Sequence, residues 1–119
     1  DERGTLTIVQ TVPCAQQASQ PCEIVCDREG RCLYVTLRGP EAVAVFAIDA
    51  ESGLLAARQM ASSLGDTPRH IALSPDGSLA LVSNQLSGQV MGFAVGADGA
   101  LTPTGLVIPV PSPACVVFL

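Results

Sequence analysis

The chain has 119 residues, 48% of them hydrophobic, and a formal net charge of −5 at pH 7. Only 14% of its residues are charged, against roughly 25% in ordinary soluble domains, so much of the chain must be buried. The acidic balance argues against a nucleic-acid partner, because phosphate backbones bind basic surfaces, and an aromatic content of 3% leaves few rings to stack on bases.

Short apolar runs separated by turn residues predict strands along the whole chain. An outer strand at 4–12 is followed by a polar loop at 14–20. Four runs follow at 23–26, 32–37, 42–48 and 54–60, and four more at 70–74, 79–84, 89–95 and 100–108. A last apolar run lies at 115–119. Turns such as 75–77 (PDG) separate the runs, since proline presets φ and glycine accepts a positive φ.

The two sets of four runs are copies of one unit. Glu23 superposes on His70 at an offset of 47 positions, and the same offset superposes Gly30 on Gly77. His70 in turn superposes on Cys115 at an offset of 45. A period of roughly 45 to 49 residues is typical of β-propeller blades.

We therefore predict an all-β chain, a β-propeller fragment with about two complete four-stranded blades at 22–67 and 68–112. An outer strand precedes the blades, and an inner closing strand at 114–119 follows them. Residues 1–119 are then the C-terminal part of a single propeller domain. Closed propellers take about four to eight blades, and two blades alone leave open sheet edges. The expected partners are therefore missing N-terminal blades or further copies of the chain.

The five cysteines, at positions 14, 22, 26, 32 and 115, contain no CxxC pair and no zinc-finger spacing. We interpret them as reduced thiols, with a Cys26–Cys32 bridge as the alternative, and we expect no metal and no cofactor. No apolar run reaches the roughly 18 residues that span a bilayer, and no signal peptide opens the chain. We expect a cytoplasmic protein without a membrane partner; a targeting segment N-terminal to Asp1 remains an open alternative.

Repeat-equivalent positions of a propeller form a ring around its channel. Glu23, His70 and Cys115 open three successive inner strands, so we expect them side by side at one mouth of the channel. Arg69 adjoins His70, and further polar residues end the second strands at the same mouth. The repeat alone therefore gathers a carboxylate, an imidazole, a thiol and guanidinium groups.

Four segments carry a family resemblance: 68–77 (PRHIALSPDG), 82–85 (VSNQ), 101–105 (LTPTG) and 110–119 (VPSPACVVFL). They resemble the lactonase family of seven-bladed propellers, which contains the propeller-type 6-phosphogluconolactonases and the carboxymuconate-lactonizing enzymes. The resemblance covers essentially the whole chain. It departs at 27–30 (DREG), where the family has Ser-Pro-Asp-Gly, at 36–39 (TLRG), where it has Ser-Asn-Arg-Gly, and at Val117, where it often has lysine.

The resemblance implies that a lactone binds in the channel mouth, among Glu, Arg and His positions. Hydrolysis of a lactone needs an activated water and a group that stabilises the oxyanion. Glu23 and His70 are the predicted catalytic residues, and either is a candidate general base. Histidine, with an unperturbed pKa of about 6.5, is the better suited on chemistry alone. Cys115 as a nucleophile is the weaker alternative.

Arg38, Arg69, Gln85 and Asn84 are the predicted substrate-binding residues. The arginines offer planar forks for a phosphate or carboxylate, and the two amides suit sugar hydroxyls. Three of them have a structural alternative: Arg38 in an ion pair with Glu23, and the two amides as caps of a strand end. His70 likewise has an alternative as a hydrogen-bonded structural residue.

Two classes of function follow. The first is 6-phosphogluconolactonase-like hydrolysis of a sugar lactone, or a carboxymuconate-type lactonizing reaction, on a small anionic sugar lactone or carboxylate. The second is a non-catalytic propeller that binds a ligand or a protein, since one fold hosts many functions. The Glu, His and Arg residues favour the enzyme, whereas the altered turn at 27–30 and the short length favour the scaffold.

Overall fold

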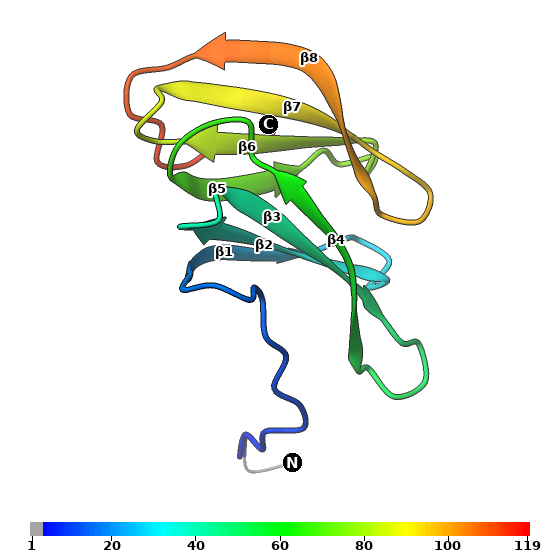
Figure 1. Ribbon diagram of the computed structural model, residues 1–119. Helices are drawn as coiled ribbons and strands as arrows, with labels where there is room; N and C mark the ends of the chain where they lie inside the picture. Colours follow the sequence, from blue (N-terminus) through cyan, green and yellow to red (C-terminus); the bar gives the residue numbers. More distant parts are fainter. Residues whose placement is uncertain (1–3) are drawn as a thin grey trace.

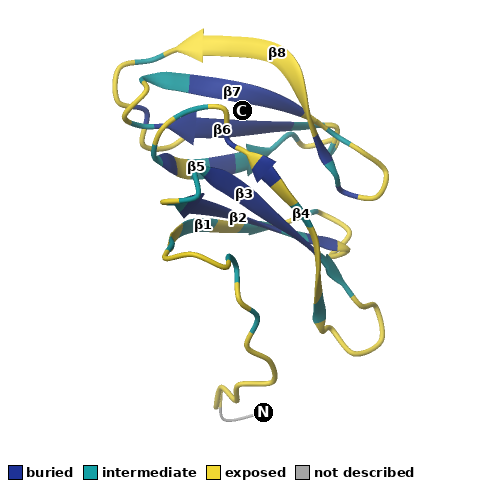
Figure 2. Cartoon of the chain, in the orientation of Figure 1, coloured by how far each residue is buried: buried dark blue, intermediate teal, exposed yellow. Residues whose placement is uncertain are grey.

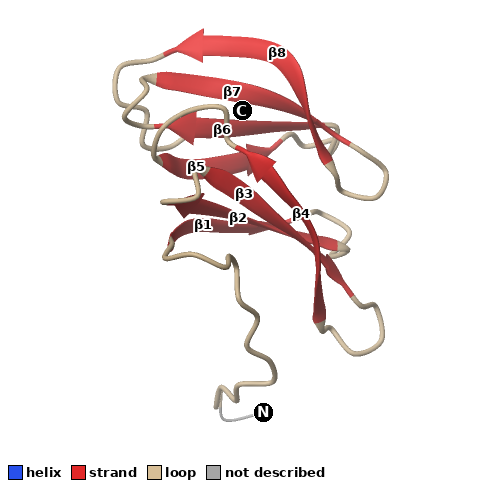
Figure 3. Cartoon of the chain, in the orientation of Figure 1, coloured by secondary structure: helices blue, strands red, loops and turns tan. Residues whose placement is uncertain are grey.

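The computed structural model describes residues 4–119, which form two four-stranded antiparallel sheets and no helix (Figure 1, Figure 3). The first sheet contains β1 (Gln20–Cys26), β2 (Cys32–Arg38), β3 (Ala42–Ile48) and β4 (Leu55–Ser62). The second contains β5 (Pro68–Leu73), β6 (Leu79–Asn84), β7 (Gln89–Val95) and β8 (Leu101–Pro109). In each sheet the strands follow one another in chain order, so the all-β prediction is confirmed.

Each sheet carries the same two irregularities of register. The inner pairs β1–β2 and β5–β6 shift between Pro21 and Ile24 and between Pro68 and His70. The outer pairs β3–β4 and β7–β8 shift between Val45 and Phe46 and between Met91 and Phe93. A bulge bends a strand and changes the direction of the side chains beside it. The repeat therefore extends below the level of whole strands, to local distortions of the backbone.

The main core lies between the two sheets, where alternate residues of each sheet face the other (Figure 2). Tyr34, Val43 and Val45 of the first sheet pack with Val82 and Phe93 of the second. The opposite face of the first sheet is also apolar, and the N-terminal segment packs on it; this second cluster contains Val35, Leu37, Ala44 and Phe46 with Val12, Cys14 and Ala15. Strands β2 and β3 are therefore buried on both faces, which explains their nearly continuous apolar sequence.

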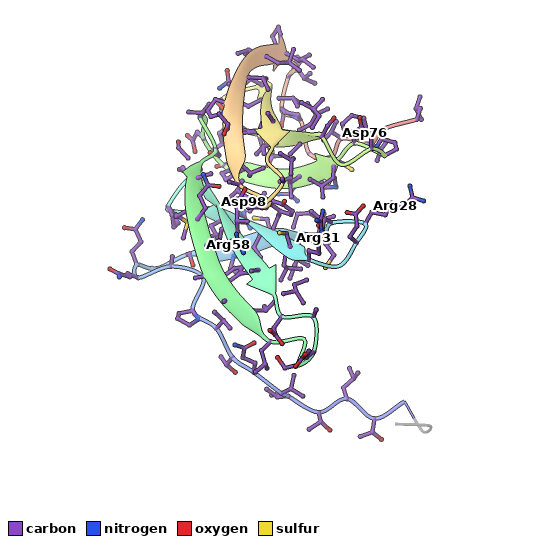
Figure 4. All side chains as sticks on the ribbon, turned by 90° about the vertical axis from the view of Figure 1, so that its right-hand side faces the viewer. Arg28, Arg31, Arg58, Asp76 and Asp98 are labelled. Carbon is purple, nitrogen blue, oxygen red and sulfur yellow. The ribbon has the colours of Figure 1, made fainter. Side chains whose placement is uncertain are left out.

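Polar contacts at one end of the sheets tie the two together. The buried Tyr34 hydroxyl donates to the Gly99 carbonyl at 3.0 Å, and burial raises the pKa of Tyr34, so the phenol remains a donor. Arg58 of β4 reaches Asp98 at 3.8 Å (Figure 4). At Gly99, where φ is +83°, a Cβ would lie 2.3 Å from the Cys32 sulfur, so only glycine fits.

A glutamine clasp joins the sheets through the backbone of β8. The Gln59 side chain donates to the Leu101 carbonyl at 3.0 Å and accepts from the Leu101 N–H at 2.8 Å. Gln10 makes the same pair of hydrogen bonds to Leu55, at 3.0 and 2.7 Å. The segment around Gln10 therefore contacts the first sheet as β4 contacts the second, which is the position that the repeat predicts for an outer strand.

The structure differs from the prediction at both ends of the chain. Residues 4–12 and 115–119 were expected as strands, but neither has strand structure. A strand needs a hydrogen-bonded neighbour, and no described strand pairs with either segment. The first lies under the first sheet in Figure 1. The second contacts His70 of β5 and lines a hollow together with residues of β1 and β5.

All five cysteines are free thiols, so the alternative Cys26–Cys32 bridge is absent. Cys32 is buried, whereas Cys26 is exposed on the neighbouring strand. Burial is the first cause that raises the pKa of the Cys32 thiol, with the Asp27 carboxylate beside it as the second. Among residues 4–119, no helix combines the length and apolarity that a membrane crossing requires.

Candidate active site

Three segments far apart in sequence meet at the inner edge of the sheets. Strand β5 lies beside β1 and β2, and a hollow of about 390 Å³ is lined by 23–25, 70–73, Pro75 and 116–118. These are the inner strands of the two sheets and the C-terminal segment. Two of the repeat-equivalent positions, Glu23 and His70, therefore face a common space, together with the residues that follow Cys115.

His70 stands at the centre of this meeting point. Its Nε2 lies 3.3 Å from the Glu23 Oε2 and 3.4 Å from the Cys115 Sγ. The backbone N–H of Val116 donates to its Nδ1 at 3.5 Å. The His70 side chain is 18% exposed and that of Glu23 is 35% exposed, so the pair is partly shielded but open to solvent. The expected adjacency of Glu23, His70 and Cys115 is confirmed; the chemical roles predicted for them remain predictions.

The bulge in β1 fixes how Glu23 is presented. Glu23 lies within the register shift between Pro21 and Ile24, and its N–H donates to the Thr36 hydroxyl at 3.0 Å instead of joining a regular ladder. Its Oε1 accepts the N–H of Ile24 at 3.0 Å. One carboxylate oxygen is therefore held by the backbone, and the other is directed at His70.

Arg38 does not pair with Glu23. Its Nε donates to the Cys22 sulfur at 2.8 Å, from the end of β2 to the bulged part of β1. The suggested Glu23–Arg38 ion pair is therefore replaced by a Glu23–His70 pair. In the ladder Arg38 pairs with Gln20, and Cys22 and Glu23 both lie in the register shift that follows Pro21.

Arg69 and Gln85 lie on the same side of the second sheet. The Arg69 Nη1 donates to the Gln85 Oε1 at 3.3 Å, and the Gln85 amide donates to the Ser112 hydroxyl at 3.3 Å. Gln85 thereby links an exposed arginine to the segment that leads into Cys115. Arg69 also lines the pocket described below, whereas Gln85 is connected to that pocket through Arg69.

Asn84 is the exception among the predicted site residues. Its side chain is fully buried, and its amide donates to the Ser63 carbonyl at 2.8 Å. A Cβ on Gly65 would lie 2.5 Å from this amide, so the contact is close. The structure thus places Asn84 apart from the mouth, holding the loop between β4 and β5, because successive residues of a strand point to opposite faces.

The polar residues of the mouth surround a pocket of about 330 Å³. Its lining comes from both inner strands, from the end of β2 and from the C-terminal segment: Pro21, Cys22, Glu23, Arg38, Arg69, His70 and Ala114. Two guanidinium groups thus share a small space with one carboxylate and one imidazole. This is an arrangement for a small anionic ligand.

Other hollows lack this chemistry. A hollow of about 580 Å³ lies between the N-terminal segment and the edge of the first sheet, and its lining has no charged residue: 13–17, Pro40 and Met60. Within residues 4–119 no group of three or more His, Cys, Asp or Glu side chains has an arrangement that could hold a metal ion.

The sequence reasoning missed three members of the site. Cys22 contacts Arg38, Ser112 holds Gln85, and the backbone of Val116 contacts the His70 ring. Their positions beside Glu23 and Cys115 in the sequence were a signal for Cys22 and Val116. Val116 contacts His70 through its backbone N–H, and a residue type does not reveal a role of the backbone.

Comparison with known proteins agrees with the fold. A 6-phosphogluconolactonase of Bacillus subtilis strain 168 is 34% identical over 102 residues, which cover 85% of this chain and 29% of that protein. The crystal structure of a putative 6-phosphogluconolactonase from Bacteroides fragilis matches with a TM-score of 0.90 and 28% identity, over 94% of this chain and 32% of that one.

A periplasmic gluconolactonase of Pseudomonas aeruginosa matches with a TM-score of 0.78 and 32% identity, over 87% of this chain and 30% of that one. The chain spans less than a third of the curated relatives it matches. The model of the family described as lactonase, 7-bladed beta-propeller, matches residues 1–118. The two sheets are therefore blades, and the chain belongs to the lactonase family of seven-bladed β-propellers.

Proposed function

We propose that this protein hydrolyses a sugar lactone at the mouth formed by its inner strands. The observation that carries the proposal is the Glu23–His70 pair, with 3.3 Å between Oε2 and Nε2, at a pocket that two arginines also line. The relatives named 6-phosphogluconolactonase support the same reaction class. No specific observation favours a lactonizing enzyme or a binding scaffold over hydrolysis.

The reaction needs one proton acceptor in the right place. As the oxygen of a water molecule attacks the lactone carbonyl carbon, a base takes a proton from that water and the carbonyl electrons move to oxygen. The intermediate then collapses, the bond to the ring oxygen breaks, and the ring oxygen takes up a proton. Glu23 and His70 are the candidate bases within the pocket. The net result is addition of water across one ester bond.

The arginines suggest why the substrate is anionic. Arg38 and Arg69 line the pocket from different blades, and the sequence carries a net charge of −5, so this mouth is a local concentration of positive charge. A planar guanidinium binds phosphate or carboxylate oxygens through two parallel hydrogen bonds. We propose that Arg38 and Arg69, with Gln85, hold the charged end of the substrate and that the developing oxyanion lies nearer to His70.

The residues described here form one sector of the channel. We propose that residues 1–119 are the C-terminal part of a single propeller, with blades at about 22–67 and 68–112 and a closing segment at 114–119, and that further blades supply the other walls of the funnel. For the compartment we propose the cytoplasm, in keeping with free thiols at all five cysteines.

Acid release from 6-phosphogluconolactone and from unphosphorylated gluconolactone tests the proposal in the protein that carries residues 1–119. We expect faster turnover of the phosphorylated lactone, and a loss of roughly 10²-fold in Glu23→Gln or His70→Ala, the range of a general base. Arg28→Gln is the matched control, since Arg28 is exposed at a turn well away from the pocket (Figure 4). Unchanged turnover in both variants would sink the assignment.

A further inference from the structure

We infer that the backbone N–H of Val116 holds His70 in the tautomer that carries its proton on Nε2, which makes His70 a positioning residue and leaves Glu23 as the general base. The tautomer follows from the geometry alone. The assignment of the base rests on the proposed function and refines it.

The Nδ1 nitrogen of His70 faces a backbone donor. The Val116 N–H points at this nitrogen with 3.5 Å between the heavy atoms. A neutral imidazole has one nitrogen that donates and one that accepts. A proton on Nδ1 would face the proton of the Val116 amide, so Nδ1 is the accepting nitrogen and the ring proton lies on Nε2.

The Nε2 nitrogen of His70 faces two possible acceptors. Nε2 lies 3.3 Å from the Glu23 Oε2 and 3.4 Å from the Cys115 Sγ. Both can accept its proton, and a carboxylate is a much stronger acceptor than a thiol sulfur. The Nε2–H is therefore directed at Glu23. With Nδ1 occupied by a backbone donor and Nε2 already protonated, neither ring nitrogen is free to take a proton from water.

The surrounding charged and titratable groups agree with this assignment. Besides Glu23 they are Cys22 of β1, Arg38 of β2, Arg69 beside His70, and Cys115 of the C-terminal segment. Arg38 is engaged by Cys22, and Arg69 by Gln85. A ring with a proton on Nδ1 would direct that N–H at the Val116 amide.

Glu23 has the geometry that a base requires. Its side chain is 35% exposed, against 18% for His70, so water reaches the carboxylate more easily. The Ile24 N–H holds Oε1 at 3.0 Å, and His70 holds Oε2. The carboxylate takes a proton from the attacking water and returns it to the leaving ring oxygen, so it is unchanged over the cycle. His70 keeps its proton throughout and fixes the direction of the carboxylate.

Nitrogen NMR reads the tautomer without any substrate. His70 is the single histidine of residues 1–119; in the protein that carries these residues, the pair of ring signals that disappears in His70→Gln is assigned to His70. We expect the neutral ring to show its proton on Nε2. The Nδ1–H form, or an even mixture of the two, would overturn the inference.

Two variants sharpen this measurement. Val116→Pro removes the N–H and should release the ring into a mixture of tautomers. Val117→Pro removes an N–H one residue further on, at an exposed side chain, and should leave the Nε2–H form intact. An unchanged spectrum in Val116→Pro would overturn the role of this amide. If that variant does not fold, the spectrum of the unaltered chain decides alone.

The pH dependence of hydrolysis separates base from positioning residue. Glutamine presents an N–H close to where Nε2 of histidine lies, so His70→Gln should lose no more than about tenfold and keep the acid limb of the pH–rate profile. Glu23→Gln should lose roughly 10²-fold and that limb with it. The reverse pattern would overturn the assignment of the base. Hydrolysis that survives both changes would instead overturn the proposed function and leave the tautomer, which the spectrum decides, unaffected.

Discussion

Two tight turns of different sequence are closed in the same way. In the second blade the Ser74 hydroxyl accepts the Leu79 N–H at 3.0 Å. In the first blade Asp27 occupies the position of Ser74, and its Oδ1 accepts the Cys32 N–H at 3.0 Å. The altered turn at 27–30 therefore preserves the hairpin, because a carboxylate oxygen at this position replaces a hydroxyl oxygen.

Asp76 makes the second of these turns sensitive to pH. The Ser74 hydroxyl donates to its carboxylate at 2.6 Å, and the N–H and hydroxyl of Ser78 also donate to it. These hydrogen bonds, from Ser74 first, lower the pKa of Asp76 below the usual range. A lowered pKa in the folded state stabilises the fold above the unfolded pKa, about 4 for aspartate, and this stabilisation is lost as pH falls through the folded value.

We therefore expect Asp76→Asn to have a lower urea midpoint than the unaltered chain at pH 7. The difference should shrink below pH of about 4 and vanish when Asp76 is protonated in both states. Urea titrations at several pH values measure it. Glu51→Gln, which removes one negative charge at another exposed turn, should show no such convergence. A difference for Asp76→Asn that stays constant from pH 7 to pH 2 would contradict the account.

At the scale of the strand, the bulges decide which residues reach the channel. The shift between Pro21 and Ile24 contains Glu23, whose carboxylate faces His70, and Cys22, whose sulfur accepts a hydrogen bond from Arg38. The equivalent shift in β5 stands next to His70 itself. Because both blades carry the bulge at the same place in the repeat, it belongs to the geometry of the blade. Its effect is to direct polar side chains of two inner strands into one pocket.

The Gln59 clasp is the second feature at this scale, and it gives a prediction about stability. Gln59→Leu leaves the N–H and carbonyl of Leu101 without their side-chain partner at a partly buried site. We expect the free energy of unfolding to fall by about 2 kcal/mol. Urea denaturation measures the loss.

Gln10→Leu is the matched comparison, because Gln10 forms the same pair of bonds to Leu55 but at an exposed position. Its effect should be clearly smaller, since water replaces exposed hydrogen bonds at little cost. A Gln59→Leu chain as stable as the unaltered one, or a larger loss in Gln10→Leu, would show that the clasp does not couple the blades.

At the scale of the whole molecule, the repeat predicted most of the fold. β3, β6 and β7 begin and end where the repeat places them, because each is bounded by turn residues and buried on both sides. The adjacency of Glu23, His70 and Cys115 followed from the same periodicity. The bounds of these strands and the adjacency of repeat-equivalent residues depend only on the average path of the backbone.

The remaining features depend on details that the periodicity does not contain. The Arg38–Cys22 contact follows from a bulge, which no residue type marks. The burial of Asn84 follows from which face of β6 it occupies at the strand end. Residues 4–12 and 115–119 have strand-like sequences but no neighbouring strand to pair with. In each case the deciding partner is distant in sequence.

The N-terminal segment covers the open face of the first sheet, which gives a prediction for the molecule as a whole. Val12, Cys14 and Ala15 pack on the cluster that contains Phe46. Removal of residues 1–15 should uncover this face, with a loss of about 2 kcal/mol of apolar burial and a Tm lower by about 8 °C. Binding of an apolar dye should rise. Removal of residues 1–8 alone keeps these contacts, so its effect on both quantities should be clearly smaller; equal effects of both deletions would contradict the prediction.

The Gln59 side chain forms hydrogen bonds with the backbone N–H and carbonyl of Leu101, and the Gln10 side chain does the same at Leu55. Every residue except proline has both of these backbone groups. The hydrogen bonds therefore place almost no constraint on the residue type at positions 55 and 101. Neighbouring blades can therefore accumulate substitutions, or be duplicated and exchanged in evolution, without a compensating change on the other side of the joint. Hydrogen bonds between a side chain and the backbone of the next blade are thus one way in which a propeller keeps its structure while its sequence changes.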